Sequence, residues 1–140
     1  MSFLKDISLI KDIVEKSLEK LKSAEDLYSL KHYDDAISRA YYSVFHMMTA
    51  VVFSKGNTFS SHKETISFFN KEYLNTSLIT DILFKDIKDL FDKRQAGDYD
   101  IKTGFDENTA KDCIIKAKNI FNNCIRYLSD IYQEKFEYLI

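Results

Sequence analysis

Apolar residues recur at steps of three and four along most of this chain, the spacing of one face of an α-helix. In residues 4–30 the stripe comprises Ile7, Ile10, Val14, Leu18, Leu21, Ala24 and Leu27. Near the C-terminus it comprises Ala110, Cys113, Ala117, Phe121, Cys124, Leu128 and Ile131. We see no alternation of apolar and polar residues of the kind that strands show. The pattern therefore predicts an all-α protein.

Polar and turn-forming residues divide this pattern into four long helices and one short one. The expected helix starts are Asp34 or Asp35, Ser60 or Ser61 (with Glu64 completing a capping box), Ser77 and Asp106. Gly56 and Gly97 are expected to follow the ends of helices two and four. We expect one domain over residues 1–140, folded as an up-and-down helical bundle.

Composition and charge narrow the class of protein. The chain is 45% hydrophobic, with three glycines and no proline, which excludes disorder and permits long helices. Its net charge of −2 provides no overall attraction to nucleic acid or to an acidic membrane, so such contacts need a local patch. No apolar run approaches the roughly 20 residues that cross a bilayer.

Cys113 and Cys124 are eleven residues apart on one expected helix, about 16 Å along its axis. This separation is too long for a disulfide. Buried free thiols in the cytoplasm are the expected state, and the sequence indicates no metal site and no cofactor.

Helix two carries a narrow polar stripe between two apolar faces. Arg39, Tyr42, His46 and Thr49 are spaced by three, four and three residues, which aligns them on the helix. They are either the hydrogen-bonded edge of a core helix or a shared functional surface. In the second case His46 can exchange protons and Arg39 can hold a phosphate.

Helix four shows a second candidate position. Arg94 continues an apolar stripe formed by Ile79, Leu83, Ile87 and Leu90. A cation in this place needs a partner, and Asp98 is the nearest carboxylate in sequence. Alternatively, Arg94 satisfies the last carbonyls of the helix. His62 lies at an expected helix start, where a structural role is more common than a catalytic one, and His32 is given no role.

Four segments together resemble a HEPN domain over roughly residues 15–130, most closely the stand-alone prokaryotic branch. They are HYDDAISRAYYSVFHMMTAVVFSKG (32–56), SHKETISFFNKEY (61–73), LFDKRQAGDYD (90–100) and FDENTAKDCIIKAKNIFNNCIRYL (105–128). The resemblance implies a helical bundle that commonly forms homodimers. Many members are metal-independent ribonucleases, often toxins, and some are neutralised by a small nucleotidyltransferase. Others are inactive modules that bind RNA or a nucleotide.

Active members of that family use an arginine followed four to six residues later by a histidine. Arg94 corresponds to the arginine, but RQAGDYD contains no histidine, and Tyr99 stands five residues on. A tyrosine with a pKa near 10 is a poor base at neutral pH. Arg39 and His46 have six residues between them but lie on helix two. The match thus leaves ribonuclease activity undecided.

Three hypotheses follow. The leading hypothesis is a homodimeric module that binds RNA, a nucleotide or a nucleotidyltransferase. Its expected ligand site comprises Arg39, Tyr42, His46, Arg94, Asp98 and Tyr99. The second is a metal-independent ribonuclease toxin, with His46 as base and Arg94 or Arg39 stabilising the phosphorane. The third is a purely structural subunit whose polar stripe is an interface.

Overall fold

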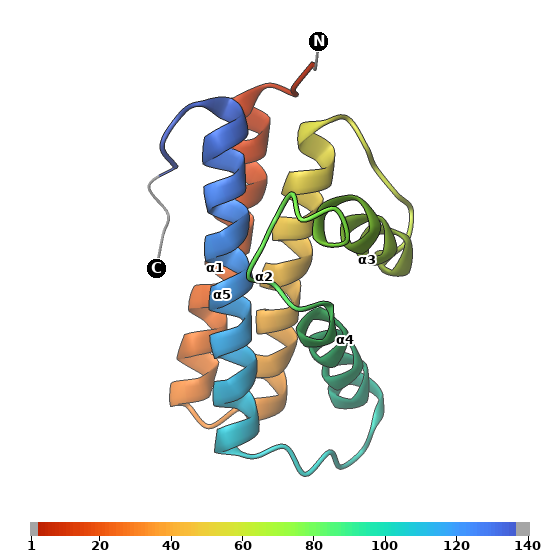
Figure 1. Ribbon diagram of the computed structural model, residues 1–140. Coiled ribbons are helices and arrows are strands. Elements are labelled where there is room, and N and C mark those ends of the chain that lie inside the picture. The colour runs from red at the N-terminus through yellow and green to blue at the C-terminus, as the bar shows by residue number, and fades with distance from the viewer. Residues whose placement is uncertain (1–2, 137–140) are drawn as a thin grey trace.

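The computed structural model describes residues 3–136 and contains five α-helices in this range, with no strand among the described residues (Figure 1). The helices are α1 (Ile7–Ser29), α2 (Tyr33–Ser54), α3 (His62–Phe69), α4 (Phe84–Tyr99) and α5 (Glu107–Tyr132). A π-helical turn, η1 (Asn70–Leu74), continues α3. The prediction of an all-α protein is confirmed.

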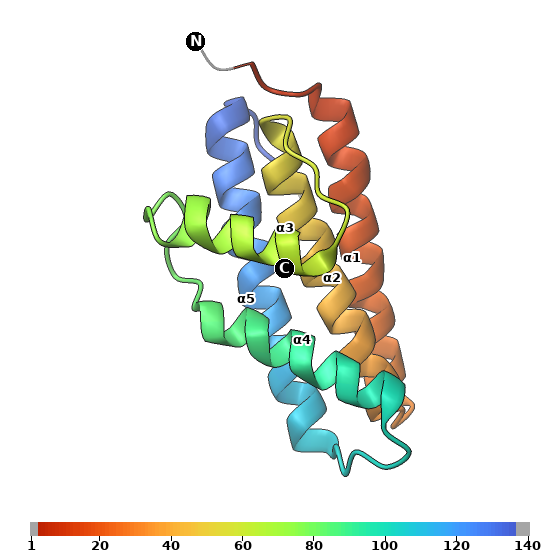
Figure 2. The same ribbon diagram turned by 90° about the vertical axis from the view of Figure 1, so that its right-hand side faces the viewer.

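Helix α2 lies at the centre of the molecule. Helices α1, α2 and α5 run side by side along the long axis, while the shorter α3 and α4 lie across one face of this group (Figure 2). Helix α2 packs against each of the other four α-helices. Twelve of its residues are buried, as a helix that is apolar over most of its circumference requires.

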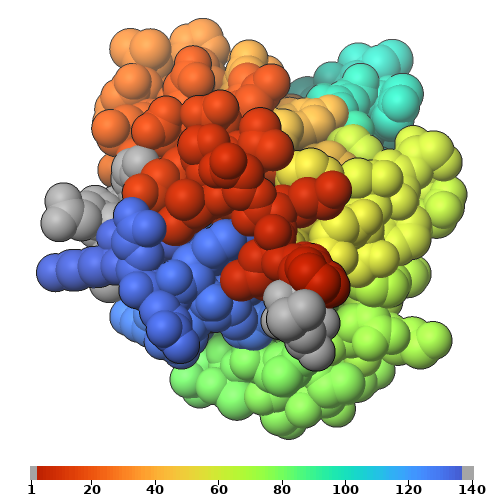
Figure 3. Space-filling view, turned by 90° about the horizontal axis from the view of Figure 1, so that it is seen from above, coloured from red at the N-terminus to blue at the C-terminus, as the bar shows by residue number. Residues whose placement is uncertain are grey.

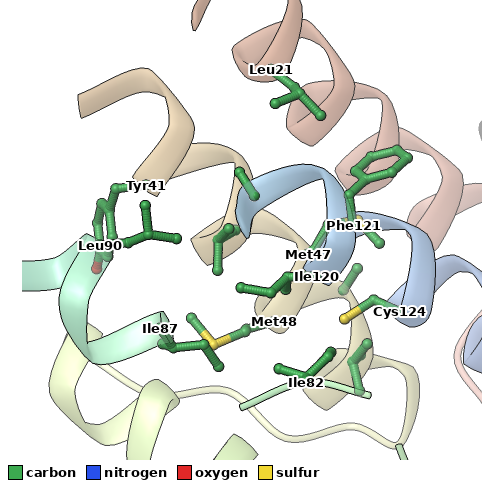
Figure 4. Packing of buried hydrophobic residues seen from close by; sticks show 14 of the residues in the cluster. Leu21, Tyr41, Met47, Met48, Ile82, Ile87, Leu90, Ile120, Phe121 and Cys124 are labelled. Atoms are coloured by element: carbon green, nitrogen blue, oxygen red, sulfur yellow. The ribbon is translucent and has the colours of Figure 1, made fainter. Parts of the chain in front are cut away.

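Apolar contacts fix α4 on α2. Met48 of α2 lies next to Ile87 of α4, and Tyr41 of α2 lies next to Leu90 (Figure 4). All four side chains are fully buried. Burying side chains of this size stabilises the fold by about 1.5–3 kcal/mol each. The position of α4, and therefore of Arg94 on its next turn, is set by this core.

The expected helix caps are partly correct. The side chain of Ser61 accepts a hydrogen bond from the Glu64 backbone N–H, and that of Asp106 accepts one from the Thr109 N–H. The prediction for α2 was wrong, because this helix begins at Tyr33 without a side-chain cap. Asp34 is engaged elsewhere, since its carboxylate accepts a hydrogen bond of 2.8 Å from the hydroxyl of Thr103.

Helix α4 begins at Phe84, seven residues later than the expected start at Ser77. Ser77 and Asp81 both have positive φ angles (60° and 65°), which interrupt a right-handed helix. Ile79 is buried from this irregular segment, whereas Leu83 is 56% exposed rather than part of an inner helical face. Ile79 and Leu83 therefore do not belong to the apolar face of α4, although their spacing in the sequence fits a helix. At its other end α4 passes the expected stop near Gly97 and ends at Tyr99.

The beginning of the described chain is held near the end of α5. The Lys5 backbone N–H donates to the Ser54 carbonyl, and its own carbonyl accepts from the Tyr132 hydroxyl, both at 2.8 Å. Figure 3 shows this N-terminal segment between the last part of α5 and the chain around residue 60. No helix within residues 3–136 is long and apolar enough to span a membrane.

Both cysteines are buried and free, as expected. Burial raises the pKa of the Cys113 thiol to about 11. The thiolate, which is the reactive form, is therefore disfavoured.

Candidate functional site

Arg94 lies over a group of aromatic rings where α4 crosses α2. Its Cζ atom is 4.9 Å from the ring centroid of Tyr41, 5.5 Å from that of Tyr42 and 5.7 Å from that of Phe91. Ring faces attract cations at such distances, and the planar guanidinium stacks on them better than an ammonium would. Two consecutive tyrosines of α2 thus hold one arginine of α4.

The guanidinium of Arg94 is only partly satisfied by hydrogen bonds. Its Nη1 donates to Oδ2 of Asp98 at 3.2 Å, one helical turn later, which confirms the expected pair. Its Nε is buried and has no acceptor among the described residues. Burial alone lowers the pKa of Arg94, but Asp98 and the two tyrosines raise it above its ordinary value. The side chain is 12% exposed and permanently charged.

His62 joins this cluster from α3. Its Nδ1 and the hydroxyl of Tyr41 share a hydrogen bond of 2.8 Å. Its ring stacks on Phe45, with centroids 3.8 Å apart and planes inclined by 18°. His62 is the first residue of α3, directly after the Ser61 cap, so the helix start fixes its backbone. Tyr41 therefore contacts both a histidine and an arginine.

Charge and burial set the protonation states in the cluster. Burial raises the pKa of Tyr41 to about 12, although the Arg94 cation opposes this shift. Burial and the same cation lower the pKa of His62. Tyr41 and His62 are thus both neutral at pH 7. With its proton on Nδ1, the imidazole donates to Tyr41 and keeps Nε2 as an acceptor; with its proton on Nε2, it accepts from the tyrosine.

His46 lies next to this cluster, on the side of α1. Burial lowers the pKa of His46 to about 4, and the charges of Lys16 and Lys20 act in the same direction. Its ring is near that of Phe45, with centroids 6.1 Å apart. Among the described residues, the rings that contact the Arg94 guanidinium are tyrosines and a phenylalanine, not His46.

The other predicted site residues lie further out. Arg39 is exposed on α2. Thr49 donates its hydroxyl proton to the Phe45 carbonyl at 2.9 Å, a bond within the helix. Tyr99, the last residue of α4, is 78% exposed. Of the predicted ligand site, the structure brings together Tyr42, Arg94 and Asp98, with His46 adjoining.

The sequence interpretation gave His62 a structural role and did not place it in the site. Its neighbours Tyr41 and Phe45 are about twenty residues away in sequence, so no local spacing connects them. The available signal was its position directly after a capping serine, where the positive helix end favours a neutral imidazole. Taken together, the cluster offers a permanent cation, a neutral imidazole and several ring faces, which suits an anionic ligand with aromatic parts.

Comparisons with known proteins agree with this architecture. Residues 10–133 match the model of the HEPN domain. Two similar proteins come from Methanocaldococcus jannaschii, and each is named as a "putative toxin". They are 29% and 28% identical over 85% and 87% of this chain, covering 81% and 90% of their own lengths. A protein of Thermotoga maritima named UPF0332 protein is 29% identical over 83% of this chain and 88% of its own. This chain belongs to the HEPN domain family.

Proposed function

We propose that this HEPN domain binds single-stranded RNA, with Arg94 as the phosphate contact. The observation that carries the proposal is the partly satisfied guanidinium: Nη1 is bound to Asp98, while Nε is buried without an acceptor. A buried donor of this kind is costly unless it gains a partner. A phosphate oxygen is a suitable partner, because arginine binds phosphates through forked hydrogen bonds.

The aromatic side chains around Arg94 support RNA as the source of the phosphate. Unstacked bases of single strands bind to the faces of aromatic rings. Tyr42 is half-buried beside the guanidinium, so its ring is partly available to a ligand. The overall charge of −2 requires such a local site, because general attraction to a polyanion is lacking. A homodimer and a nucleotidyltransferase partner, which the family resemblance suggests, stay predictions.

Fluorescence anisotropy of a labelled single-stranded RNA tests this proposal. We expect Arg94→Gln to weaken binding about tenfold or more, since charge-assisted hydrogen bonds contribute about 1.5–3 kcal/mol. Arg126→Gln is the matched control, because Arg126 is an exposed arginine of α5. Circular dichroism verifies that both variants fold. Equal affinity of Arg94→Gln and wild type would remove Arg94 from the site.

A ribonuclease is the second candidate, favoured by the contact of both His62 and Arg94 with Tyr41. Cleavage of RNA through its own 2′-OH needs a proton acceptor and a cation for the developing phosphorane charge. The names of the two Methanocaldococcus relatives are compatible with this activity. In this geometry His62, rather than His46, is the base, because His62 shares the aromatic cluster with the cation.

Incubation with RNA in the presence of a chelator tests the second candidate. We expect His62→Gln to abolish metal-independent cleavage, whereas His46→Gln retains most of it. Loss of cleavage only in His46→Gln would instead favour the base expected from the sequence. Intact RNA with the wild-type protein would leave binding without catalysis as the function.

A further inference from the structure

A small pocket opens between α3 and α4, next to the cluster around Arg94. Its volume is about 280 Å³. Three residues of α3 and three of α4 line it: Lys63, Ile66, Ser67, Phe84, Lys88 and Phe91. These two helices are the ones that lie across the bundle in Figure 2. The pocket is thus formed by the same pair of helices that supplies His62 and Arg94.

The pocket has an apolar floor and a cationic rim. Ile66 and Phe91 are nearly fully buried, at 6% and 7% exposure, and Phe84 is half-buried. Lys63 and Lys88 are exposed. The Nζ of Lys88 is 5.8 Å from the Phe91 ring centroid and 3.4 Å from Asp92. An exposed lysine–aspartate pair of this length contributes little, so Lys88 can still contact an anion.

Phe91 connects this pocket to Arg94. The same ring lines the pocket and lies 5.7 Å from the Arg94 Cζ. Lys88 and Arg94 are six residues apart on α4, about 9 Å along the helix axis. The Lys88 Nζ and the Arg94 Cζ also lie 5.8 and 5.7 Å from the centroid of the same Phe91 ring, so a chain of phosphates that passes Arg94 can continue towards Lys88 and Lys63.

The chemistry of the pocket suits one nucleobase. A flat aromatic ring accepts a stacked base, and the Ser67 hydroxyl can both donate to and accept from a base edge. The volume is slightly below the usual range of about 300–1,000 Å³ for ligand pockets, which favours a base with its sugar over a larger ligand. Two lysines at the rim disfavour an acyl chain and complement phosphates on either side of the base.

We propose that this pocket holds one base of a single-stranded RNA whose phosphate backbone lies along Arg94, Lys88 and Lys63. The inference rests on the proposed function and adds a subsite to it. Phe84 provides the stacking surface, Phe91 and Ile66 form the apolar floor beneath it, and Ser67 contacts the base edge. RNA is then held by its backbone at Arg94 and by a base between α3 and α4.

An eight-nucleotide RNA that carries 2-aminopurine in place of adenine tests the pocket, because stacking on an aromatic ring quenches the fluorescence of this base. With wild type we expect quenching on binding. Phe84→Leu keeps an apolar side chain but removes the ring, and we expect about tenfold weaker binding with loss of quenching. Leu83→Ala, at the exposed residue just before α4, is the matched control and leaves both unchanged. We expect Lys63→Gln to reduce the slope of log binding constant against log salt concentration by about the amount of one phosphate contact.

Each contrary result has a distinct meaning. If Phe84→Leu binds and quenches like wild type while Arg94→Gln binds weakly, the base pocket is wrong and the RNA site stands. If wild type binds no RNA, both proposals fail. Sedimentation in which Phe84→Leu weakens self-association, with RNA binding unchanged, would assign the pocket to a second copy of the chain and overturn the subsite. Displacement of the RNA by AMP at equal concentration would assign the pocket to a free nucleotide and also contradict the proposal.

Discussion

Tyr41 connects the two functional candidates of this protein at the level of single residues. Its hydroxyl bonds to His62, and its ring carries the guanidinium of Arg94. The sequence identified Arg94 because a charge continuing an apolar stripe is conspicuous, and it identified Asp98 by the i,i+4 spacing. It could not identify His62 in the same way, since the contacts of that ring come from α2, across a turn and a loop.

Tyr41→Phe separates the two roles of the tyrosine. The substitution keeps the ring under Arg94 but removes the hydrogen bond to His62. We expect a loss of about 1 kcal/mol in the free energy of unfolding, measured by urea denaturation. Tyr28→Phe, which removes an exposed hydroxyl bonded to Glu107 at 3.2 Å, is the control and is expected to cost less. An unchanged stability of Tyr41→Phe would mean that the Tyr41–His62 bond is replaced by water without cost.

The charge of Arg94 also acts on His62. Because this cation, together with burial, lowers the pKa of His62, Arg94→Met is expected to raise that pKa towards its ordinary value. The shift is measurable from the imidazole resonances in an NMR titration, with Arg126→Met as control. A pKa of His62 that stays the same or falls in Arg94→Met would contradict the arrangement of these two groups.

At the level of helices, the spacing of apolar residues predicted α1, α2 and α5 well, since long amphipathic helices are specified by their own pattern. It failed at the start of α4, where Ser77 and Asp81 adopt positive φ angles. The side chain of Asn119, on α5, supports this segment by donating to the Asp81 carbonyl at 2.9 Å. Such tertiary contacts cannot be deduced from the local sequence.

The cap of α3 should matter for both stability and the site. Ser61→Ala removes the acceptor for the Glu64 N–H, so we expect a loss of about 1 kcal/mol in thermal or urea denaturation. Ser60→Ala is the control, because the Ser60 hydroxyl makes only an exposed 3.4 Å contact with the Glu64 carboxylate. If the two variants are equally stable, Ser61 is not the effective cap. We also expect changed His62 resonances in Ser61→Ala alone.

For the molecule as a whole, one apolar core positions residues from three helices around Arg94. Helix α2 contributes the tyrosines, α3 the histidine and α4 the arginine, and α3 and α4 both pack on α2 (Figure 2). The fold class could be predicted from sequence because it depends on repeated spacing. The convergence of side chains depends on how α3 and α4 cross α2, which no periodicity reveals.

Acid should destabilise the folded protein through His46. The pKa of this residue is lowered from 6.5 to about 4 in the folded state, so between these values the unfolded chain binds more protons. The contribution of His46 to the free energy of unfolding is therefore complete above pH 6.5. It decreases as the pH falls towards 4, by about 1–2 kcal/mol after allowance for partial exposure. Urea denaturation at several pH values measures this slope. We expect a shallower slope in His46→Gln, and a wild-type slope in His32→Gln; equal slopes in all three proteins would exclude His46 as the cause.

The buried Nε–H of Arg94 provides the sharpest test of RNA binding. Its ¹⁵N–¹H resonance can be followed by NMR while single-stranded RNA is added, with Arg39 and Arg126 as internal references. If Arg94 holds a phosphate, its Nε–H gains an acceptor, so we expect a downfield proton shift and slower exchange with water, larger than at either reference arginine. Saturating RNA that leaves the Arg94 resonance in place, or that shifts only Arg39 or Arg126, would contradict the proposed site.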